Sequence, residues 1–171
     1  MFVIESREKV LDGSVIIREA KMKTYNIHHE VGIKASPKAV YQALTDTKKL
    51  ARWWTSDTRG NGSKVGGVLE FWFGDSCHKF EVVELQPGKL VRWKADRKEG
   101  SEEWAGTEVA FSLSADEKQC YVHFSHSGWR RDSGIFPHTS TKWAVFMLSL
   151  KDLLEKGKGH PAPDDLEINH D

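Results

Sequence analysis

His126 stands in a stretch of alternating apolar residues and shares one predicted strand face with Val122 and Phe124. Because alternation directs this face at the buried side of a sheet, the imidazole could orient a ligand in an apolar cavity or act as a weak acid or base. The simpler alternative is a core histidine that hydrogen-bonds to a backbone carbonyl. We favour that alternative, since most buried polar groups are paired within the protein.

Glu84 is the second side chain whose position suggests chemistry. It has the same parity as Phe80 and Val82, so alternation places its carboxylate on an otherwise apolar strand face. A carboxylate in an apolar cavity could serve as a general acid or base. We favour a structural ion pair, with Arg52 or Arg92 as its partner, because ion-pair networks also bring carboxylates to such positions.

Residue types that bind metals occur in two places, and neither has the required geometry. His28, His29 and Glu30 follow one another in a predicted strand, so His29 faces the inner side of the sheet while His28 and Glu30 face solvent. Cys77 and Cys120 lie far apart without metal-site spacing, as expected of buried small apolar groups. With no nucleophile motif or phosphate-binding glycine loop, the sequence predicts no metal and no cofactor, and binding rather than covalent chemistry.

Trp53 and Trp54 end a predicted helical pair just before the segment 55–67, which is rich in Gly, Ser, Asn and Asp and is expected to be a loop. One of these rings could line the mouth of a cavity whose entry the loop controls, or both could simply cover the end of a sheet. Adjacent helical residues diverge by about 100°. We therefore expect only one of the two to face inward, without choosing between them.

The composition limits the classes of function. Lys plus Arg and Asp plus Glu are both 25, and no basic block stands out, so we expect no nucleic-acid partner. The sequence has no run of about 18 apolar residues and no apolar core near its start, so we expect a cytoplasmic chain without a membrane segment. Seven Trp and eight Phe suit either an aromatic core or the wall of a ligand cavity.

Hydrophobic periodicity predicts the elements that must position these residues. A half-buried strand covers residues 25–34, Ser36-Pro37 begins one helix, and Asp46 or Thr45 begins a second short one. Further strands are expected at 68–73, 77–85, 89–94, 107–113 and 121–126, and one long amphipathic helix at 138–156. Antiparallel strands with helices gathered on one side indicate the α+β class.

Periodicity also indicates which side chains face the interior. Together with the polar candidates and the tryptophan pair, they form the predicted ligand-binding set: Trp53, Trp54, Phe71, Phe73, Val82, Glu84, Phe111, Phe124, His126, Trp143, Met147 and Leu150. For each apolar member the alternative is core packing, since a cavity wall and a core use the same chemistry. No residue is assigned a catalytic role.

Several short segments, in a fixed order, resemble a known family. They are Ala35-Ser36-Pro37 with Val40, Ala51-Arg52-Trp53-Trp54, Val65-Gly66-Gly67, His126-Ser127-Gly128-Trp129, Ser149-Leu150-Lys151-Asp152-Leu153-Leu154-Glu155 and Gly157-Lys158-Gly159. This set is similar to the START-like superfamily (SRPBCC), in the branch resembling the C-terminal domain of the activator of heat shock protein 90 ATPase. The resemblance covers about residues 24–168 and implies a helix-grip fold, in which a curved antiparallel sheet wraps around a long C-terminal helix beside a cavity.

One strand departs from the pattern of that family. Where the family places aromatic or apolar residues after Leu90, this sequence has Arg92 and Lys94 on either side of Trp93. Either the inner face of this strand is shifted, or a cation points into the cavity.

The resemblance leaves several functions open, because one fold hosts many. We expect an N-terminal extension at 1–22, a helix-grip domain at 23–157 and a C-terminal tail at 158–171 that lies on the surface as a strap. The first expected function is binding of a small hydrophobic or amphipathic ligand between sheet and helix, by a monomer or homodimer. The alternatives are a chaperone-interacting module that regulates heat shock protein 90 ATPase, and a cyclase or hydratase-type enzyme that uses Glu84 or His126.

Overall fold

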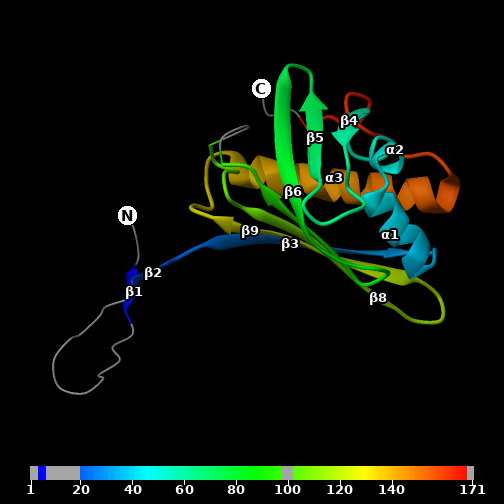
Figure 1. Cartoon of the computed structure of the whole chain (residues 1–171), viewed down its shortest axis with the longest axis horizontal. Coiled ribbons are helices and arrows are strands. Elements are labelled where there is room, and N and C mark those ends of the chain that lie inside the picture. Colours follow the sequence, from blue (N-terminus) through cyan, green and yellow to red (C-terminus); the bar gives the residue numbers. More distant parts are fainter. Residues whose placement is uncertain (1–3, 7–19, 98–101, 169–171) are drawn as a thin grey trace.

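The computed structural model describes residues 4–6, 20–97 and 102–168, and its centre is an antiparallel sheet curved around one long helix (Figure 1). The strands of the main sheet are β3 (Tyr25–Ile33), β4 (Asp57–Gly60), β5 (Val68–Phe73), β6 (Ser76–Gln86), β7 (Leu90–Ala95), β8 (Glu108–Ala115) and β9 (Cys120–Trp129). The helices are α1 (Pro37–Thr45), α2 (Thr47–Leu50) and α3 (Ile135–Lys156). Two short strands, β1 (Ile4–Ser6) and β2 (Ala20–Met22), pair in a separate sheet.

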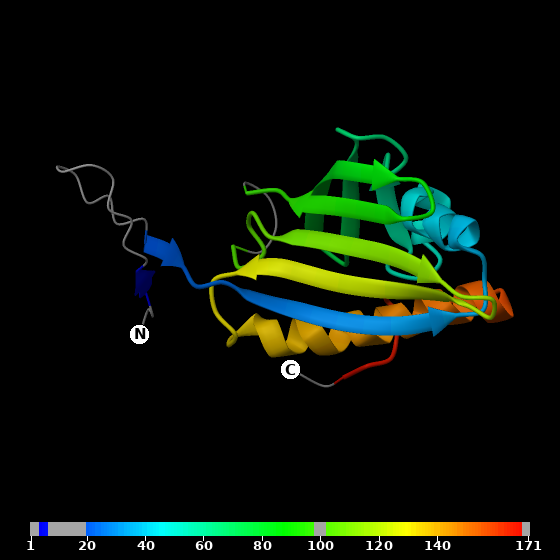
Figure 2. The ribbon, with the colours of Figure 1, turned by 90° about the horizontal axis from the view of Figure 1, so that it is seen from below.

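The strand order of the main sheet is β3-β9-β8-β7-β6-β5-β4, and each neighbouring pair is antiparallel. Seen from below, α3 lies beside β3 and β9, under the hollow face of the sheet (Figure 2). The helix buries Trp143, Met147 and Leu150 against that face, which confirms the predicted apolar stripe. The α+β class and the helix-grip arrangement are therefore confirmed.

Helix α3 is longer than its periodicity predicted. It begins at Ile135 rather than at residue 138, after Gly134, whose φ of 66° lies in the left-handed region. It ends where predicted, because Gly157 adopts φ 79° and its amide bonds to the carbonyl of Leu153. No helix in the described residues combines enough length and apolar character to cross a bilayer.

The helical pair α1 and α2 begins at the predicted caps. The hydroxyl of Ser36 accepts a hydrogen bond from the amide of Ala39 at 3.2 Å, with Pro37 next to it in the first turn. Of the two candidates for the second cap, Asp46 has this role, since its carboxylate accepts from the amides of both Lys48 and Lys49. These caps direct the chain from the end of β3 towards Trp53 and Trp54.

Replacing Asp46 with Ala should lower the free energy of unfolding by about 1 kcal/mol. The reason is that the amides of Lys48 and Lys49 lose their acceptor. Urea unfolding measures the loss. Asp46→Asn keeps an acceptor oxygen and is the matched control, so most of the stability should return in that variant. An equal loss in both variants would contradict the capping role.

The segment 55–67 was expected to be a loop, and that prediction is wrong for residues 57–60. These residues form β4, which pairs with β5 from Asp57 opposite Trp72 to Gly60 opposite Leu69. As an edge strand, β4 is mostly exposed and carries no alternation of apolar and polar residues. The sequence pattern therefore could not reveal it, because hydrophobic periodicity reports only strands with one buried face.

A register shift in β6 changes which side chains face the core. The pairing of β6 with β7 is irregular between Val82 and Glu84, and beyond this point Leu85 lies opposite the buried Val91. Directly opposed residues share a face. Leu85 therefore packs on the core side, and Glu84, opposite Arg92, lies on the outer side.

The inner face of β7 is formed by Val91, Trp93 and Ala95, all of them buried. Arg92 is half-buried beside Glu84, and Lys94 is exposed. Of the two explanations for the unusual cations, the one in which a cation points into the cavity is therefore wrong for both residues.

The chain after α3 returns across the domain as a strap, residues 158–168. The amide of His160 donates to the hydroxyl of Ser149 at 2.7 Å, and the amide of Ala162 donates to the carbonyl of Trp54 at 2.8 Å. The amide of Ser56 in turn donates to the carbonyl of Ala162. The strap thus ties α3 to the segment after α2. Of the predicted terminal segments, residues 1–3, 7–19 and 169–171 lie outside the described residues, as do residues 98–101 between β7 and β8.

Candidate ligand-binding site

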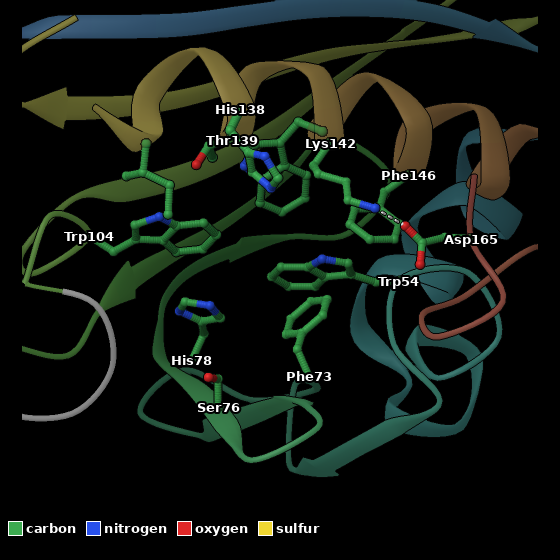
Figure 3. A pocket seen from close by; sticks show the side chains of 12 residues that line it. Trp54, Phe73, Ser76, His78, Trp104, His138, Thr139, Lys142, Phe146 and Asp165 are labelled. Atoms are coloured by element: carbon green, nitrogen blue, oxygen red, sulfur yellow. Dashed lines mark hydrogen bonds and ion pairs between the residues drawn. The ribbon is translucent and has the colours of Figure 1, made fainter. Parts of the chain in front are cut away.

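A cavity of about 290 Å³ lies beneath the N-terminal half of α3, between the helix and the hairpin of β5 and β6 (Figure 3). Its walls come from α3, the β5–β6 hairpin, the segment before β8, the end of the α1–α2 pair and the strap. The lining residues are Trp54, Phe73, Ser76, His78, Trp104, Ile135, His138, Thr139, Lys142, Trp143, Phe146 and Asp165. Five Trp and Phe rings and Ile135 form the apolar part of this surface, and the six remaining lining side chains are polar or charged.

Trp54 forms the inner end of the cavity and is held by other rings. Its ring centroid lies 3.9 Å from that of Phe71 and 4.7 Å from that of Trp143. It also stacks nearly parallel to Trp93, at 5.9 Å and 3°. Ring pairs at such separations add stability beyond the area that they bury. The Trp54 wall is consequently rigid.

His78 and Trp104 form the opposite wall. Their rings stack at a centroid distance of 4.3 Å and an angle of 22°, and the edge of His78 meets Phe73 at 5.7 Å. Burial lowers the pKa of His78, because the charged imidazolium would lose its hydration. This wall is therefore uncharged at neutral pH.

An ion pair between Lys142 of α3 and Asp165 of the strap lies at the mouth of the cavity (Figure 3). The ammonium group also donates to the carbonyl of Leu166 at 3.4 Å and lies 5.8 Å from the ring centroid of Phe146. Only 8% of the Asp165 side chain is exposed. A carboxylate so far from water requires a partner of opposite charge, and Lys142 supplies it.

His126 lies behind the cavity wall, not in the lining, and both of its ring nitrogens are engaged. The indole N–H of Trp143 donates to Nδ1 at 3.1 Å, so Nε2 carries the proton and donates to the hydroxyl of Thr107 at 2.8 Å. That hydroxyl donates onward to the carbonyl of Trp104 at 2.6 Å. The partners are thus an indole and a hydroxyl, where the sequence suggested a backbone carbonyl.

The environment of His126 keeps its imidazole neutral. Burial lowers the pKa of His126 to about 3, and repulsion from a protonated His78 contributes in the same direction. The neutral ring joins Trp143 and Trp104, two walls of the cavity, through one chain of hydrogen bonds. Its role in this geometry is to position those walls.

Glu84 does not reach the cavity, and its predicted place on an apolar face is wrong because of the register shift in β6. Its carboxylate lies 3.0 Å from the guanidinium of Arg92 and accepts from the side-chain amide (Nε2) of Gln86 at 2.7 Å. About a third of its side chain is exposed. Of the two partners considered from sequence, Arg92 is the one observed. Neither polar group required by a cyclase or hydratase therefore lines the cavity.

We expect Glu84→Gln to change the free energy of unfolding by less than about 1 kcal/mol, because partly exposed ion pairs contribute little. Chemical denaturation measures this change. Arg92→Gln, which removes the other partner, should have an effect of similar size. A loss of several kcal/mol in the Glu84 variant alone would indicate a role that the pairing with Arg92 does not describe.

The predicted ligand-binding residues divide into two groups. Trp54, Phe73 and Trp143 line the cavity. The other apolar members are packed in the core and do not line it: Trp53, Phe71, Val82, Phe111, Phe124, Met147 and Leu150. Both members of the tryptophan pair are buried, but only Trp54 reaches the cavity. Trp53 donates instead to the carbonyl of Ala43 at 2.9 Å and meets Phe111 edge-on.

Sequence reasoning missed several lining residues, and for most of them no signal was available. Trp104 lies in a turn without periodicity, and Asp165 comes from the strap. His78 lies near the start of β6, where side chains are only half-buried. Lys142 could have been found, since it falls four residues before the apolar Phe146 and therefore on nearly the same side of the helix.

The histidines of β3 behave as alternation predicted. His28 is exposed, whereas His29 faces α3 and donates from Nε2 to the carbonyl of Ser140 at 2.9 Å. Glu30 lies 2.8 Å from Nδ1 of His123 on the outer side of the sheet. Among the described residues no three His, Cys, Asp or Glu side chains are arranged to hold a metal ion.

Comparison with known proteins gives relatives of the whole domain. The family model described as "Activator of Hsp90 ATPase homolog 1-like protein" matches residues 34–155. The solution structure of the Aha1 dimer from Colwellia psychrerythraea is 46% identical and has a TM-score of 0.73, over 79% of this chain and 99% of that chain. Among curated proteins no relative matches.

Two more distant structures share the fold alone. Protein MLL2253 from Mesorhizobium loti is 19% identical over 76% of this chain and 96% of that chain, with a TM-score of 0.67. DynU16, from the dynemicin biosynthetic locus, is 20% identical over 78% of this chain and 48% of that chain, with a TM-score of 0.65. The family match covers most of the helix-grip domain and includes α1, α2, all strands from β4 to β9 and α3 except its last residue. This chain belongs to the family of activator of Hsp90 ATPase homolog 1-like proteins, in the START-like superfamily.

Proposed function

We propose that this protein binds a small aromatic or amphipathic ligand in the cavity beneath α3. The observation that carries the proposal is the cavity itself, a half-open space of about 290 Å³ lined by large aromatic rings together with polar side chains. Ligand sites in proteins are typically concave and mostly apolar, with a small number of polar groups that orient the ligand. The cavity has this composition.

The size of the cavity limits the ligand. An apolar cavity of about 150 Å³ holds one benzene ring. A volume of about 290 Å³ therefore suits a molecule of about two fused rings. The rest of the interior is filled by side chains such as Trp53, Phe111 and Phe124, each at most 2% exposed. We accordingly expect this protein to reject long lipids.

A thermal-shift screen with one-ring, two-ring and long-chain compounds tests the proposal. A ligand at a hundredfold its dissociation constant should stabilise the fold by about 2.7 kcal/mol. Two-ring compounds should give the largest rise in melting temperature. If no aromatic compound raises it, the proposal fails.

A variant that blocks the mouth should locate the binding site. Ser76 is exposed at the rim of the cavity, so Ser76→Trp should place a ring across the opening without disturbing the core. Any two-ring ligand found in the screen should then bind at least about tenfold more weakly, a loss of about 1.4 kcal/mol. Ser112→Trp, at an exposed position of β8, is the matched control and should bind as the parent does. Equal binding by both variants would place the ligand elsewhere.

The second candidate function is regulation of a chaperone ATPase in the cytoplasm. It is favoured by the 46% identity to the Aha1 protein of Colwellia psychrerythraea over almost all of that chain. Adding this protein to a bacterial heat shock protein 90 should then raise the rate of ATP hydrolysis, and the two should associate in a pull-down. Unchanged chaperone turnover would remove this candidate. Light scattering would show whether the chain, like that relative, forms a dimer.

A further inference from the structure

The Lys142–Asp165 pair separates the aromatic cavity from a second, larger groove. That groove has a volume of about 670 Å³ and runs along the strap, past Thr55, Trp72 and Pro163. Phe73, Lys142 and Asp165 line both spaces. The ion pair is therefore the partition between them, and a molecule entering the aromatic cavity from the groove passes the ammonium group of Lys142.

Asp165 belongs to the end of the strap, beyond its firm attachment. The strap is held tightly at Gly159, where an added Cβ would approach the carbonyl of Arg52 to 2.3 Å, and again at Ala162, which pairs with Thr55. After Ala162 the neighbours of Asp165 are exposed, with Leu166 at 70%. The carboxylate can consequently leave Lys142 while the strap stays anchored at its earlier residues.

Exchange of one carboxylate for another is favourable at this site. Burial of a lone anion is strongly unfavourable, but the carboxylate of Asp165 is nearly buried here because the half-buried ammonium of Lys142 is its partner. A ligand carboxylate that replaces Asp165 keeps the charge of Lys142 neutralised, and Asp165 returns to water. A neutral ligand that displaced Asp165 would instead leave the ammonium unpaired.

The other side chains of the cavity fit the rest of such a ligand. The rings of Trp54, Phe73, Trp104 and Phe146 surround the space next to Lys142 (Figure 3). His78 is neutral, since burial lowers its pKa. A positive charge next to an aromatic space thus favours a ligand whose acid group is attached directly to its ring.

From this geometry we infer that the ligand is a small aryl carboxylate, whose carboxylate pairs with Lys142 in place of Asp165 while its rings occupy the aromatic cavity. This inference rests on the proposed ligand-binding function and adds the chemical class of the ligand. The strap residue Asp165 acts as an internal competitor for the same site.

The test compares 1-naphthoate with 1-naphthamide, which have the same rings and nearly the same shape but differ in charge. Isothermal titration calorimetry with the full chain gives both dissociation constants. A charge-assisted hydrogen bond should make the acid bind about tenfold more tightly than the amide. The indole N–H signals of Trp54, Trp104 and Trp143 should shift with both compounds in NMR spectra.

Two variants assign this preference to the ion pair. Lys142→Met should bind acid and amide equally, whereas Asp165→Asn should bind the acid several-fold more tightly than the parent and the amide as before. Lys156→Met removes a lysine of the same helix outside the cavity, and Glu167→Gln removes an acid of the strap that makes no ion pair with Lys142. Both controls should retain the parent preference. Because Asp165→Asn is expected to bind the acid more tightly, the inference does not depend on a loss of binding alone. Misfolding of the Lys142 variant could not produce that gain in affinity.

The outcomes separate this inference from the proposed function. Equal affinity of acid and amide in the parent, with indole shifts at the cavity, would overturn the aryl carboxylate and leave ligand binding intact. An acid preference that persists in Lys142→Met, or that Asp165→Asn does not increase, would also overturn it. Absence of binding by either compound would count against both.

Discussion

Acidification from pH 6.5 to pH 4 should destabilise this protein by about 3 kcal/mol through His126 alone. In the folded chain, burial lowers the pKa of His126 to about 3, whereas in the unfolded chain the imidazole has its ordinary value near 6.5. Between these two pH values the unfolded state binds one more proton. Acid therefore favours unfolding, and the contribution of His126 is complete above pH 6.5 and is lost progressively towards pH 3.

The physical reason is that His126 has no place for a second ring proton. Its Nδ1 accepts from the indole of Trp143, an N–H group that can only donate. A proton on Nδ1 would face the indole N–H of Trp143, so two donors would meet without an acceptor. It would also place a positive charge among the rings of Trp104, Trp129 and Trp143. Burial lowers the pKa of His78 too, so His78 adds to the same loss.

Guanidinium unfolding of the parent and of His126→Phe, at intervals from pH 4 to pH 8, measures this effect. At pH 8 the variant should be about 1–3 kcal/mol less stable, since the indole N–H of Trp143 loses its acceptor. Below pH 6.5 the difference in stability between the two proteins should shrink, because only the parent has a group at position 126 that can be protonated. Carboxylates with lowered pKa values, such as Asp116 and Glu155, lose their contributions in both proteins and cancel in the difference. If the free energy of unfolding changed with pH in the same way in the parent and in His126→Phe, His126 would not be a neutral, buried group.

Trp54→Ala should lower the free energy of unfolding by about 3–5 kcal/mol, the range for removal of a fully buried tryptophan. Trp54 is 1% exposed and contacts rings from β5, β6, β7 and α3, including Phe71, Phe80, Trp93 and Trp143. Its loss leaves a void that these rigid rings cannot close. Equilibrium unfolding measures the change, and millimolar indole, the group removed, should restore part of it.

The matched control for Trp54→Ala is Trp53→Ala. Trp53 is 0% exposed, so this variant should be destabilised to a similar extent. Only Trp54 lines the cavity, however. A two-ring ligand should therefore lose about tenfold in affinity with Trp54→Ala, about 1.4 kcal/mol, and much less with Trp53→Ala. Equal losses in both variants would mean that general destabilisation, rather than the cavity wall, weakens binding.

Much of the fold could be predicted because its determinants are local. The side chains of Ser36 and Asp46 accept hydrogen bonds from backbone amides at most three residues later in the chain. Both caps are therefore visible in the sequence. The stripe of Trp143, Met147 and Leu150 follows from helical spacing alone. The register shift near Glu84 could not be predicted, because alternation along β6 does not show where an extra residue interrupts its pairing with β7.

The candidate site was only partly visible for a related reason. Periodicity places Phe73, Phe111 and Trp143 on inner faces and leaves open which of Trp53 and Trp54 faces inward, but it does not state how much of the interior each ring fills. The cavity exists where the packing of these rings stops, next to Trp104 from an irregular turn. The ion pair of Lys142 and Asp165 joins α3 to the strap, over a separation of 23 residues.

By itself the sequence determined the α+β class, the order of most elements, the apolar faces of the strands and of α3, and the family. Each of these depends on neighbours in the chain, on periodicity or on ordered motifs. Only the tertiary structure decided that Trp54 rather than Trp53 meets the cavity, that Glu84 pairs with Arg92 outside it, and that Lys142 meets Asp165 at its mouth. These depend on how the rings share a fixed volume, on the register between β6 and β7, and on the contact between α3 and the strap, which residue order does not specify.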